Sequence, residues 1–240
     1  MKKTVIIVGG GKGTRMGGDL PKQFIPLQGK PILMHTLDVF YKWDAKADLL
    51  LVIPEEYVDY WNMLCRELNF TIPYRTAFGG ATRYHSVFNG LHEVEGDGLI
   101  AVHDGVRPFV TPEIISACFK MAEAYGAAIP VVPMIESVRE ITGDISLASD
   151  RHDVPPIYGN ASLFRTKSQA FDRRRLFIVQ TPQAFRADIL REAYEQPYDE
   201  RFTEEASLVE ALGYTIRLVE GSYENIKITT PNDLRSLIEN

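Results

Sequence analysis

Apolar residues along the chain fall into two patterns, short β-branched runs and longer stretches in which they recur every three or four positions. The run at residues 4–8 is almost entirely apolar, which is typical of a strand buried on both faces of a parallel sheet. Such runs predict strands at 4–8, 49–53, 72–77, 99–102, 127–132, 176–179 and 215–219, and the periodic stretches predict helices at 31–41, 55–68, 82–94, 112–125, 187–195, 204–212 and 231–238.

Strands that alternate with amphipathic helices favour an α/β, Rossmann-like fold, in which a mostly parallel mixed sheet carries helices on both faces. Sheets of this kind bind ligands at the carboxyl ends of their strands. A glycine-rich segment, the pair Gly79 and Gly80, and Asp104 each follow a predicted strand. We expect these three segments to meet at one edge of the sheet.

Residues 134–175 interrupt the alternation. Segments 136–141 and 164–171 alternate apolar with polar residues and predict strands, and the stretch between them, 150–160, is polar and contains prolines. We interpret 134–175 as a β-arm inserted into a single domain that spans residues 1–240.

The glycine-rich segment, residues 9–22, reads G-G-G-K-G-T-R-M-G-G-D-L-P-K. Glycines after a buried strand let backbone N–H groups approach an anion without obstruction by a Cβ atom, and Arg15 and Lys22 add two cations. A dinucleotide fingerprint would require a third glycine at Thr14 or Met16, and a Walker A loop would require Ser or Thr at Gly13. The segment therefore predicts a triphosphate-binding loop of a different kind.

Two further groups have alternative interpretations. Lys227 lies between Ile226 and Ile228, where its ammonium group either faces solvent or points inward to an anion. Asp104 and Arg107 follow a predicted strand and form either a structural ion pair or part of a ligand site.

Composition narrows the class of ligand. The net charge of −6 over 240 residues argues against a nucleic-acid surface and leaves a small anionic ligand.

The sequence predicts a cytoplasmic protein that does not enter membranes. It has two cysteines without metal spacing, no apolar run near 18 residues and no leader-like start. The five histidines show no ligand spacing, so we expect His85 and His103 to have packing roles and no metal to be held by the protein.

The loop spacing G-G-x-G-T-R-M-x(5)-P-K resembles that of sugar-phosphate nucleotidyltransferases, and its Pro-Lys-Gln-Phe ending is typical of cytidylyltransferases. Five further motifs follow in order along the chain: G-G-x-x-R-x-x-S-V from Gly79, V-H-D-x-x-R-P from Val102, Q-T-P-Q from Gln180, T-E-E-A-S from Thr203 (family pattern T-D-E-A-S), and E-G-x(3)-N-I-K-x-T from Glu220. Together they cover nearly the whole chain, which resembles the sugar-phosphate cytidylyltransferase family.

This resemblance implies a fold of the nucleotide-diphospho-sugar transferase type and transfer of CMP from CTP to 2-C-methyl-D-erythritol 4-phosphate. The products are 4-diphosphocytidyl-2-C-methyl-D-erythritol and pyrophosphate, in non-mevalonate isoprenoid biosynthesis. Ribitol 5-phosphate is the alternative acceptor. A non-catalytic nucleotide-binding subunit is an alternative of another class, although such subunits usually lose the loop cations that this chain keeps. A nicotinamide-dependent dehydrogenase is disfavoured by the glycine spacing.

The resemblance also implies roles for individual residues. The catalytic cations it implies are Arg15, Lys22 and Lys227, and the nucleotide-binding residues are Gly9, Gly10, Gly11, Gly13, Gly80, Ser86, Asp104 and Gly105. The implied acceptor-binding residues are Asp104, Arg107, Ser137, Arg173, Thr181 and Thr203.

Two expectations concern metal and assembly. Mg²⁺ is implied, held mainly by the CTP phosphates. The family also implies a homodimer whose arm crosses to the second subunit and carries Arg173 there, with Arg174 and Arg175 as alternatives in register. Residues 149–170 make this arm longer than the usual pattern, and the simplest interpretation is a longer loop at its tip.

Overall fold

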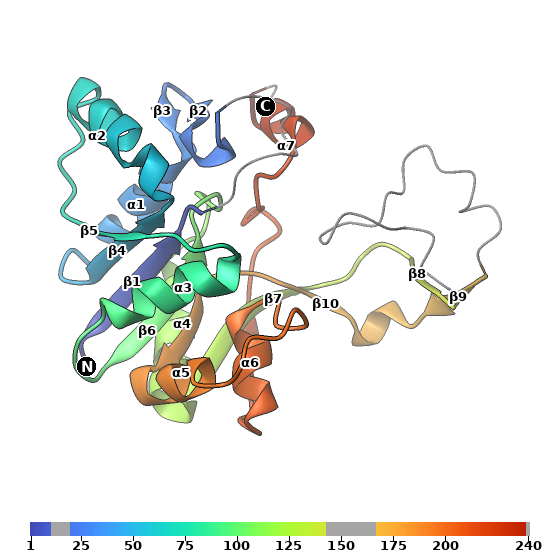
Figure 1. Cartoon of the computed structure of the whole chain (residues 1–240). Coiled ribbons are helices and arrows are strands. Elements are labelled where there is room, and N and C mark those ends of the chain that lie inside the picture. Colours follow the sequence, from blue (N-terminus) through green and yellow to red (C-terminus); the bar gives the residue numbers. More distant parts are fainter. Residues whose placement is uncertain (11–19, 143–166, 239–240) are drawn as a thin grey trace. The chain divides into compact units, whose positions relative to one another are not determined.

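Strand β1 (Lys3–Val8) runs through the middle of the central sheet (Figure 1). The structure is a computed structural model that describes residues 1–10, 20–142 and 167–238. It divides the chain into two units, one formed by Met1–Val131 with Val179–Asn240 and the other by Val132–Ile178.

The sheet is mostly parallel, as the sequence predicts. Its strand order is β10-β7-β11-β6-β1-β4-β5, and β12 also pairs with β7. β1 is parallel to β4 and β6, whereas β11 runs antiparallel to its neighbours β6 and β7. The bounds are β4 (Asp48–Ile53), β5 (Arg75–Phe78), β6 (Leu99–Asp104), β7 (Ala127–Pro133), β11 (Gln183–Arg186) and β12 (Arg217–Glu220).

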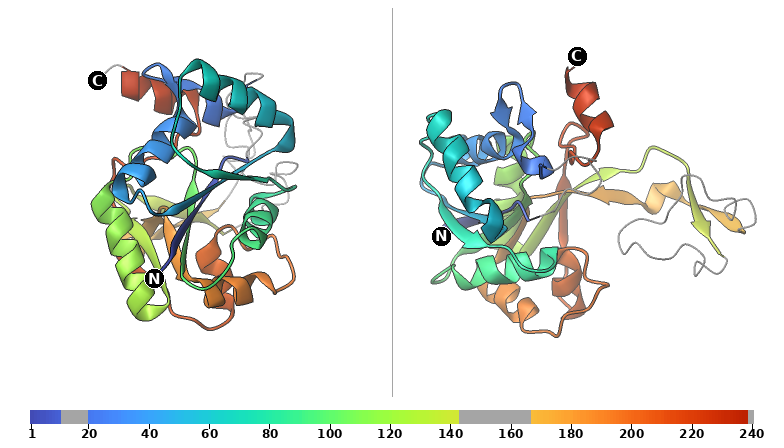
Figure 2. Two further views of the ribbon diagram at one scale, coloured as in Figure 1. Left: turned by 90° about the vertical axis from the view of Figure 1, so that its left-hand side faces the viewer. Right: turned by 45° about the horizontal axis from the view of Figure 1, so that its top comes forward.

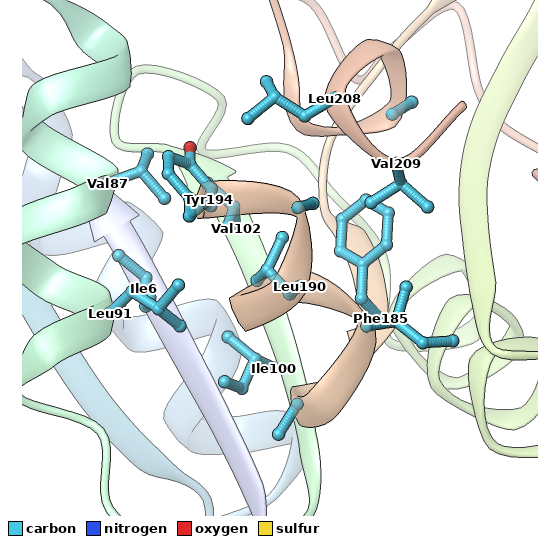
Figure 3. Packing of buried hydrophobic residues seen from close by; sticks show 14 of the residues in the cluster. Ile6, Val87, Leu91, Ile100, Val102, Phe185, Leu190, Tyr194, Leu208 and Val209 are labelled. Carbon is cyan, nitrogen blue, oxygen red and sulfur yellow. The ribbon is translucent and has the colours of Figure 1, made fainter. Parts of the chain in front are cut away.

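Helices cover both faces of the sheet because successive strand residues point to opposite sides. Ile6 packs into the cluster formed with α3 (Arg83–His92), α5 (Ala187–Tyr194) and α6 (Glu205–Ala211), which Figure 3 shows. Val5 and Ile7 point to the other face, into the cluster formed with α1 (Ile32–Trp43), α2 (Val58–Glu67) and α4 (Pro112–Tyr125). Figure 2 shows the two groups of helices on opposite sides.

Most predicted helices are confirmed, and local signals fix their ends. In α4 the Thr111 hydroxyl accepts from the backbone N–H of Ile114, Pro112 occupies the first turn, and the helix ends at Gly126 with a φ of 98°. Cys118 is fully buried in α4 and belongs to the core. The helix predicted at 55–68 is a short 3₁₀ turn, η3 (Glu55–Tyr57), followed by α2.

Several strands differ from the prediction. β5 starts at Arg75 rather than at 72, because Pro73 has no backbone N–H to donate to the sheet. β11 is missing from the prediction: only two of its four residues are apolar, and its place between β6 and β7 depends on partners far earlier in the chain, such as Val102 for Gln183 and Ala128 for Ala184. The short hairpin of β2 (Pro26–Leu27) and β3 (Lys30–Pro31) is also missing from it.

The segments that follow β1, β5 and β6 meet at one edge of the sheet, as expected. Gly9 donates its backbone N–H to the carbonyl of Val52, and Gly105 donates to that of Val8. Gly79 donates to the carbonyl of Ile53. Each segment therefore continues the pairing of its strand by one residue, and this fixes where the three segments begin.

The smaller unit contains a two-stranded antiparallel ribbon of β8 (Val138–Ile141) and β9 (Ser168–Phe171). The bond from Gln169 Nε2 to Glu140 Oε2 (2.7 Å) supports the register. A 3₁₀ turn, η6 (Arg173–Arg175), follows, and then β10 (Phe177–Val179), whose last residue is the first of the second stretch of the larger unit. Both arm strands were predicted, but residues 143–166, with most of the extra length expected at 149–170, lie outside the described residues.

The remaining helix, α7 (Pro231–Ile238), has the bounds that the sequence predicts.

Within the described part of the chain, no helix combines the length and the apolar character needed to span a membrane.

The contact between α3 and the sheet generates a stability prediction. A Cβ atom at Gly90 would lie 2.9 Å from Val52 Cγ2 and 3.2 Å from Ile6 Cγ2, and both of these side chains are fully buried. We expect Gly90→Val to lower the free energy of unfolding by about 1–3 kcal/mol in urea titrations, because overpacking forces the helix away from the sheet. The neighbouring substitution Asn89→Val, at a position that is not buried, should cost under about 1 kcal/mol. Equal losses in the two variants would contradict this interpretation.

Candidate active site

Asp104, at the carboxyl end of β6, is surrounded by three cations. Its Oδ2 lies 2.9 Å from Lys227 Nζ and 3.3 Å from Arg107 Nε, and its Oδ1 lies 3.4 Å from Arg83 Nε. We call these four residues the Asp104 cluster. It answers the first alternative left by the sequence, because the Lys227 ammonium contacts a carboxylate. Asp104 and Arg107 form an ion pair within this larger charged group, and their role in binding a ligand stays a prediction.

Arg83 links this cluster to α6. Its two terminal nitrogens, Nη1 and Nη2, donate to Glu205 Oε1 and Oε2 at 2.7 and 2.8 Å, in the paired geometry that favours arginine over lysine. Glu205 is buried, and it also accepts from the Tyr194 hydroxyl (3.1 Å). The motif that begins at Gly79 is thus joined to the T-E-E-A-S motif through side chains 122 positions apart.

Electrostatics keep these groups ionised. Burial alone would raise the pKa of Asp104, but Lys227, Arg83 and Arg107 outweigh it and hold this pKa well below its usual range. Burial alone would lower the pKa of Arg83, but Glu205 and Asp104 outweigh it and raise the pKa. The cluster therefore carries more positive than negative charge, which suits an anionic ligand.

His103 and Thr181 form hydrogen bonds to the backbone of two cluster residues, Arg107 and Asp104. Its Nε2 faces the carbonyl oxygen of Arg107 at 3.0 Å and must therefore carry the proton, which leaves Nδ1 to accept from the Thr181 hydroxyl at 3.1 Å. Thr181 Oγ1 in turn accepts from the backbone N–H of Asp104 (3.1 Å). Burial lowers the pKa of His103 to about 4, so the imidazole is neutral at pH 7. This supports the packing role expected for His103.

Hydrogen bonds to backbone carbonyls attach the motif that contains Lys227 to the Asp104 cluster. Arg107 Nη1 donates to the carbonyl of Asn225 (2.8 Å), and Asn225 Nδ2 donates to the carbonyl of Thr181 (3.0 Å). The backbone N–H of Ile228 donates to the carbonyl of Val106. These bonds on both sides of Lys227 explain how a residue so late in the chain reaches Asp104.

A cavity of about 280 Å³ opens beside the cluster. Five of its lining residues were predicted from the sequence: Asp104, Arg107, Thr181, Thr203 and Lys227. The prediction missed five others, which are Arg83, Val179, Gln180, Gln183 and Glu204. Four of these missed residues lie inside the quoted motifs, so the motifs pointed to them, but only the folded chain shows that they share a cavity.

Among the residues predicted to bind the nucleotide, Ser86 fixes the backbone around Gly80. The buried Ser86 hydroxyl accepts from the N–H of Gly80 (3.0 Å) and donates to the carbonyl of Thr82 (2.9 Å). The start of the glycine-rich segment is held by Gln23, whose Nε2 donates to the carbonyl of Gly9.

Lys22 begins a 3₁₀ turn, η2 (Lys22–Phe24), and is anchored by its neighbour Phe24. The buried ring of Phe24 packs against Tyr57, Tyr60 and Trp61 at centroid distances of 5.5 to 6.1 Å. The backbone of the predicted catalytic lysine is therefore fixed by core packing.

Several predicted residues lie elsewhere. Arg15, Gly11 and Gly13 fall outside the described residues. Ser137 and Arg173 belong to the smaller unit, where both are exposed, and Arg173 Nη1 donates to the carbonyl of Ile135. Gly10 and Gly105 lie where the sequence places them, in the segments that follow β1 and β6.

The described residues contain no group of three or more His, Cys, Asp or Glu side chains that could hold a metal ion. In the cavity, both oxygens of Asp104 face cations.

Comparison with known proteins places the chain in a family. The model of the family described as IspD, 2-C-methyl-D-erythritol 4-phosphate cytidylyltransferase, matches residues 3–157 and 160–237. The chain belongs to this family. It is a nucleotidyltransferase of the cytidylyltransferase type, as the motifs predict, and not a dehydrogenase.

Relatives of the same name match over almost their whole length. The 2-C-methyl-D-erythritol 4-phosphate cytidylyltransferase of Bacteroides thetaiotaomicron is 48% identical over 235 residues, which are 98% of this chain and 97% of the relative. That of Porphyromonas gingivalis is 46% identical over 235 residues, 97% of this chain and 95% of the relative.

Solved structures of cytidylyltransferases also match the fold. The enzyme from Thermus thermophilus superposes with a TM-score of 0.73 at 28% identity and covers 99% of this chain and 97% of that one. The Francisella tularensis enzyme superposes with a TM-score of 0.75 at 28% identity, with 100% and 99% coverage. These matches confirm the predicted α/β fold class.

The buried imidazole of His103 generates a prediction for the pH dependence of stability. Because its pKa falls from 6.5 to about 4 on folding, the unfolded chain binds more protons between these values, and stability present above pH 6.5 is lost as the pH falls. From pH 7 to pH 5 the wild type should lose about 2 kcal/mol of unfolding free energy through this residue. His103→Gln cannot titrate and should lack this loss, as measured by urea unfolding at both pH values. Equal losses in wild type and variant would contradict the assignment.

Proposed function

We propose that this cytidylyltransferase joins the phosphate of 2-C-methyl-D-erythritol 4-phosphate to the α-phosphorus of CTP. A phosphate oxygen of the acceptor forms a bond to the α-phosphorus, the bond from that phosphorus to the β-phosphate oxygen breaks, and pyrophosphate leaves with the electron pair. The observation that carries the proposal is the cationic Asp104 cluster in a cavity at the ligand-binding edge of the sheet.

The chemistry asks for cations and alignment more than for a base. The acceptor phosphate is already ionised at neutral pH, and the obstacle is the approach of two polyanions. In our proposal Lys227 and Lys22 contact the α-phosphate, and Arg15 contacts the leaving pyrophosphate. Charge that develops on the phosphate oxygens is then stabilised by groups already in place.

The nucleotide and the acceptor use different walls of the site. We assign the cytosine ring to the backbone of Gly9, Gly10 and Gly80 with Ser86, because the Ser86 hydroxyl already fixes the Gly80 N–H. The glycine-rich loop, including Gly11 and Gly13, would hold the phosphates, and Gly105 and Asp104 would border the ribose.

The acceptor would occupy the cavity. Arg107, Thr181 and Thr203 line it and would bind the phosphate and hydroxyl groups of the sugar alcohol. Ser137 and Arg173 would complete the acceptor site.

Mg²⁺, held mainly by the CTP phosphates, would reduce the negative charge that the acceptor phosphate meets. We also propose a cytoplasmic location, which suits the free thiols of Cys65 and Cys118.

We propose a homodimer in which the smaller unit of one subunit brings Arg173 to the site of the other. Four large apolar side chains of this unit are exposed in the single chain: Ile135, Phe171, Phe177 and Ile178. Exposed apolar residues gathered in one small unit favour a protein partner, and a second copy of the chain would cover them symmetrically.

The first test is pyrophosphate release by the purified protein with CTP and Mg²⁺, comparing 2-C-methyl-D-erythritol 4-phosphate with ribitol 5-phosphate. We expect release with the first acceptor. Lys22→Ala should lower kcat by about 10²-fold with the fold intact, because one preorganised cation is lost. Lys30→Ala removes an exposed lysine nearby and should leave kcat unchanged. Release only with ribitol 5-phosphate would move the enzyme to polyol-phosphate activation, and CTP binding without release would favour a regulatory subunit.

The dimer is tested by mixing two inactive variants, Lys22→Ala and Arg173→Ala, after unfolding and refolding them together. If each site combines Lys22 of one subunit with Arg173 of the other, about half of the dimers are mixed and each of these has one intact site. Activity should then recover to about a quarter of the wild-type value. No recovery, with dimers confirmed by sedimentation, would place both residues of a site in the same subunit.

A further inference from the structure

Glu204 places a carboxylate in the wall of the cavity. It is the N-cap residue of α6, and its Oε2 accepts from Gln183 Nε2 (2.5 Å). Gln183 is fully buried, and its Oε1 accepts from the backbone N–H of Ala206 (3.0 Å). The side-chain amide of Gln183, a residue of β11, therefore fixes both the Glu204 carboxylate and the first turn of α6. Among the described residues, Glu204 Oε1 has no hydrogen-bond partner.

Asp104, the other carboxylate that lines the cavity, is already paired with cations. Asp104 faces Lys227 and Arg107 with one oxygen and Arg83 with the other. A ligand hydroxyl that approached Asp104 would have to compete with these three cations. Glu204 Oε1 has no such competition and is the better acceptor for a neutral donor.

A wall that mixes cations with a carboxylate matches only some ligands. A ligand that is all phosphate would need the cations and would be repelled by Glu204. A sugar-alcohol phosphate carries both an anion and several hydroxyl donors, so it can use both kinds of group. Burial raises the pKa of Glu204, which reports poor solvation of the carboxylate in the cavity wall.

We infer that Glu204 is a specificity-determining residue, whose Oε1 accepts a hydrogen bond from a hydroxyl group of the sugar-alcohol phosphate acceptor. This inference rests on the proposed function and adds to it the group that distinguishes a polyol phosphate from other phosphates. A site built around a hydroxyl discriminates strongly against analogues that lack it, because the carboxylate is then left unpaired.

The test uses Glu204→Gln in the full-length protein. If the single oxygen of the introduced amide keeps the bond from Gln183, its NH₂ group faces the cavity and presents a donor where the hydroxyl needs an acceptor. We expect the KM for 2-C-methyl-D-erythritol 4-phosphate to rise about tenfold or more. The KM for CTP, kcat and the melting temperature should change little. Glu204→Asp, which introduces the residue of the family pattern, should recover part of the lost affinity.

Glu210→Gln is the matched control, because Glu210 is exposed on the same helix and the same charge is removed. It should leave both KM values unchanged. Acceptor analogues that each lack one hydroxyl provide the second measurement. One of them should lose about tenfold or more in kcat/KM with the wild type but no further with Glu204→Gln, which identifies the contacted hydroxyl.

Two results would overturn the inference. The first is an unchanged acceptor KM in Glu204→Gln, and the second is an equal rise in the KM values for CTP and acceptor, which would indicate a merely structural role. A wild-type protein that transfers CMP to neither acceptor would instead refute the proposed function on which the inference depends. The wild-type measurement in the same assay separates this failure from the other two.

Discussion

The site depends on one constraint, which is that three cations cannot be brought together at the end of a buried strand without a counter-charge. Asp104 supplies that charge. Its carboxylate faces Lys227, Arg107 and Arg83, which come from three separate parts of the chain. Removal of one partner from a buried ionic group typically costs about 3–5 kcal/mol, because the others are left uncompensated. The cluster is therefore also a set of long-range links that fix the tertiary structure around the cavity.

The surrounding hydrogen bonds hold the cluster in place through contacts within the protein itself. Arg83 is locked by the buried carboxylate of Glu205, and Arg107 by the carbonyl of Asn225. Thr181 and His103 satisfy the backbone on the other side of Asp104. Groups held in this way do not have to reorganise when charge develops on a phosphate, and this is the general advantage of a preorganised site.

The short antiparallel strand β11 connects the middle of the sheet to α6. It separates β6 from β7, and it carries Gln183, which joins the sheet to α6 by two bonds of one amide group. Thr181, Gln183 and Glu204 thereby enter the same cavity as Asp104. The Q-T-P-Q motif therefore has a structural role, because it connects the sheet to α6, in addition to lining the cavity.

Features with local causes could be predicted from the amino-acid pattern. Hydrophobic periodicity and capping residues set the bounds of α4 and α7, strand-then-glycine segments predicted the ligand-binding edge, and the ordered motifs predicted the family. The folded chain was needed to show that β11 is a strand, that Lys227 contacts Asp104, and that Arg83 and Glu204 share a cavity with Thr203. The physical reason is that these features depend on partners tens to more than a hundred positions away, and a local pattern carries no information about which distant charge or strand will be its neighbour.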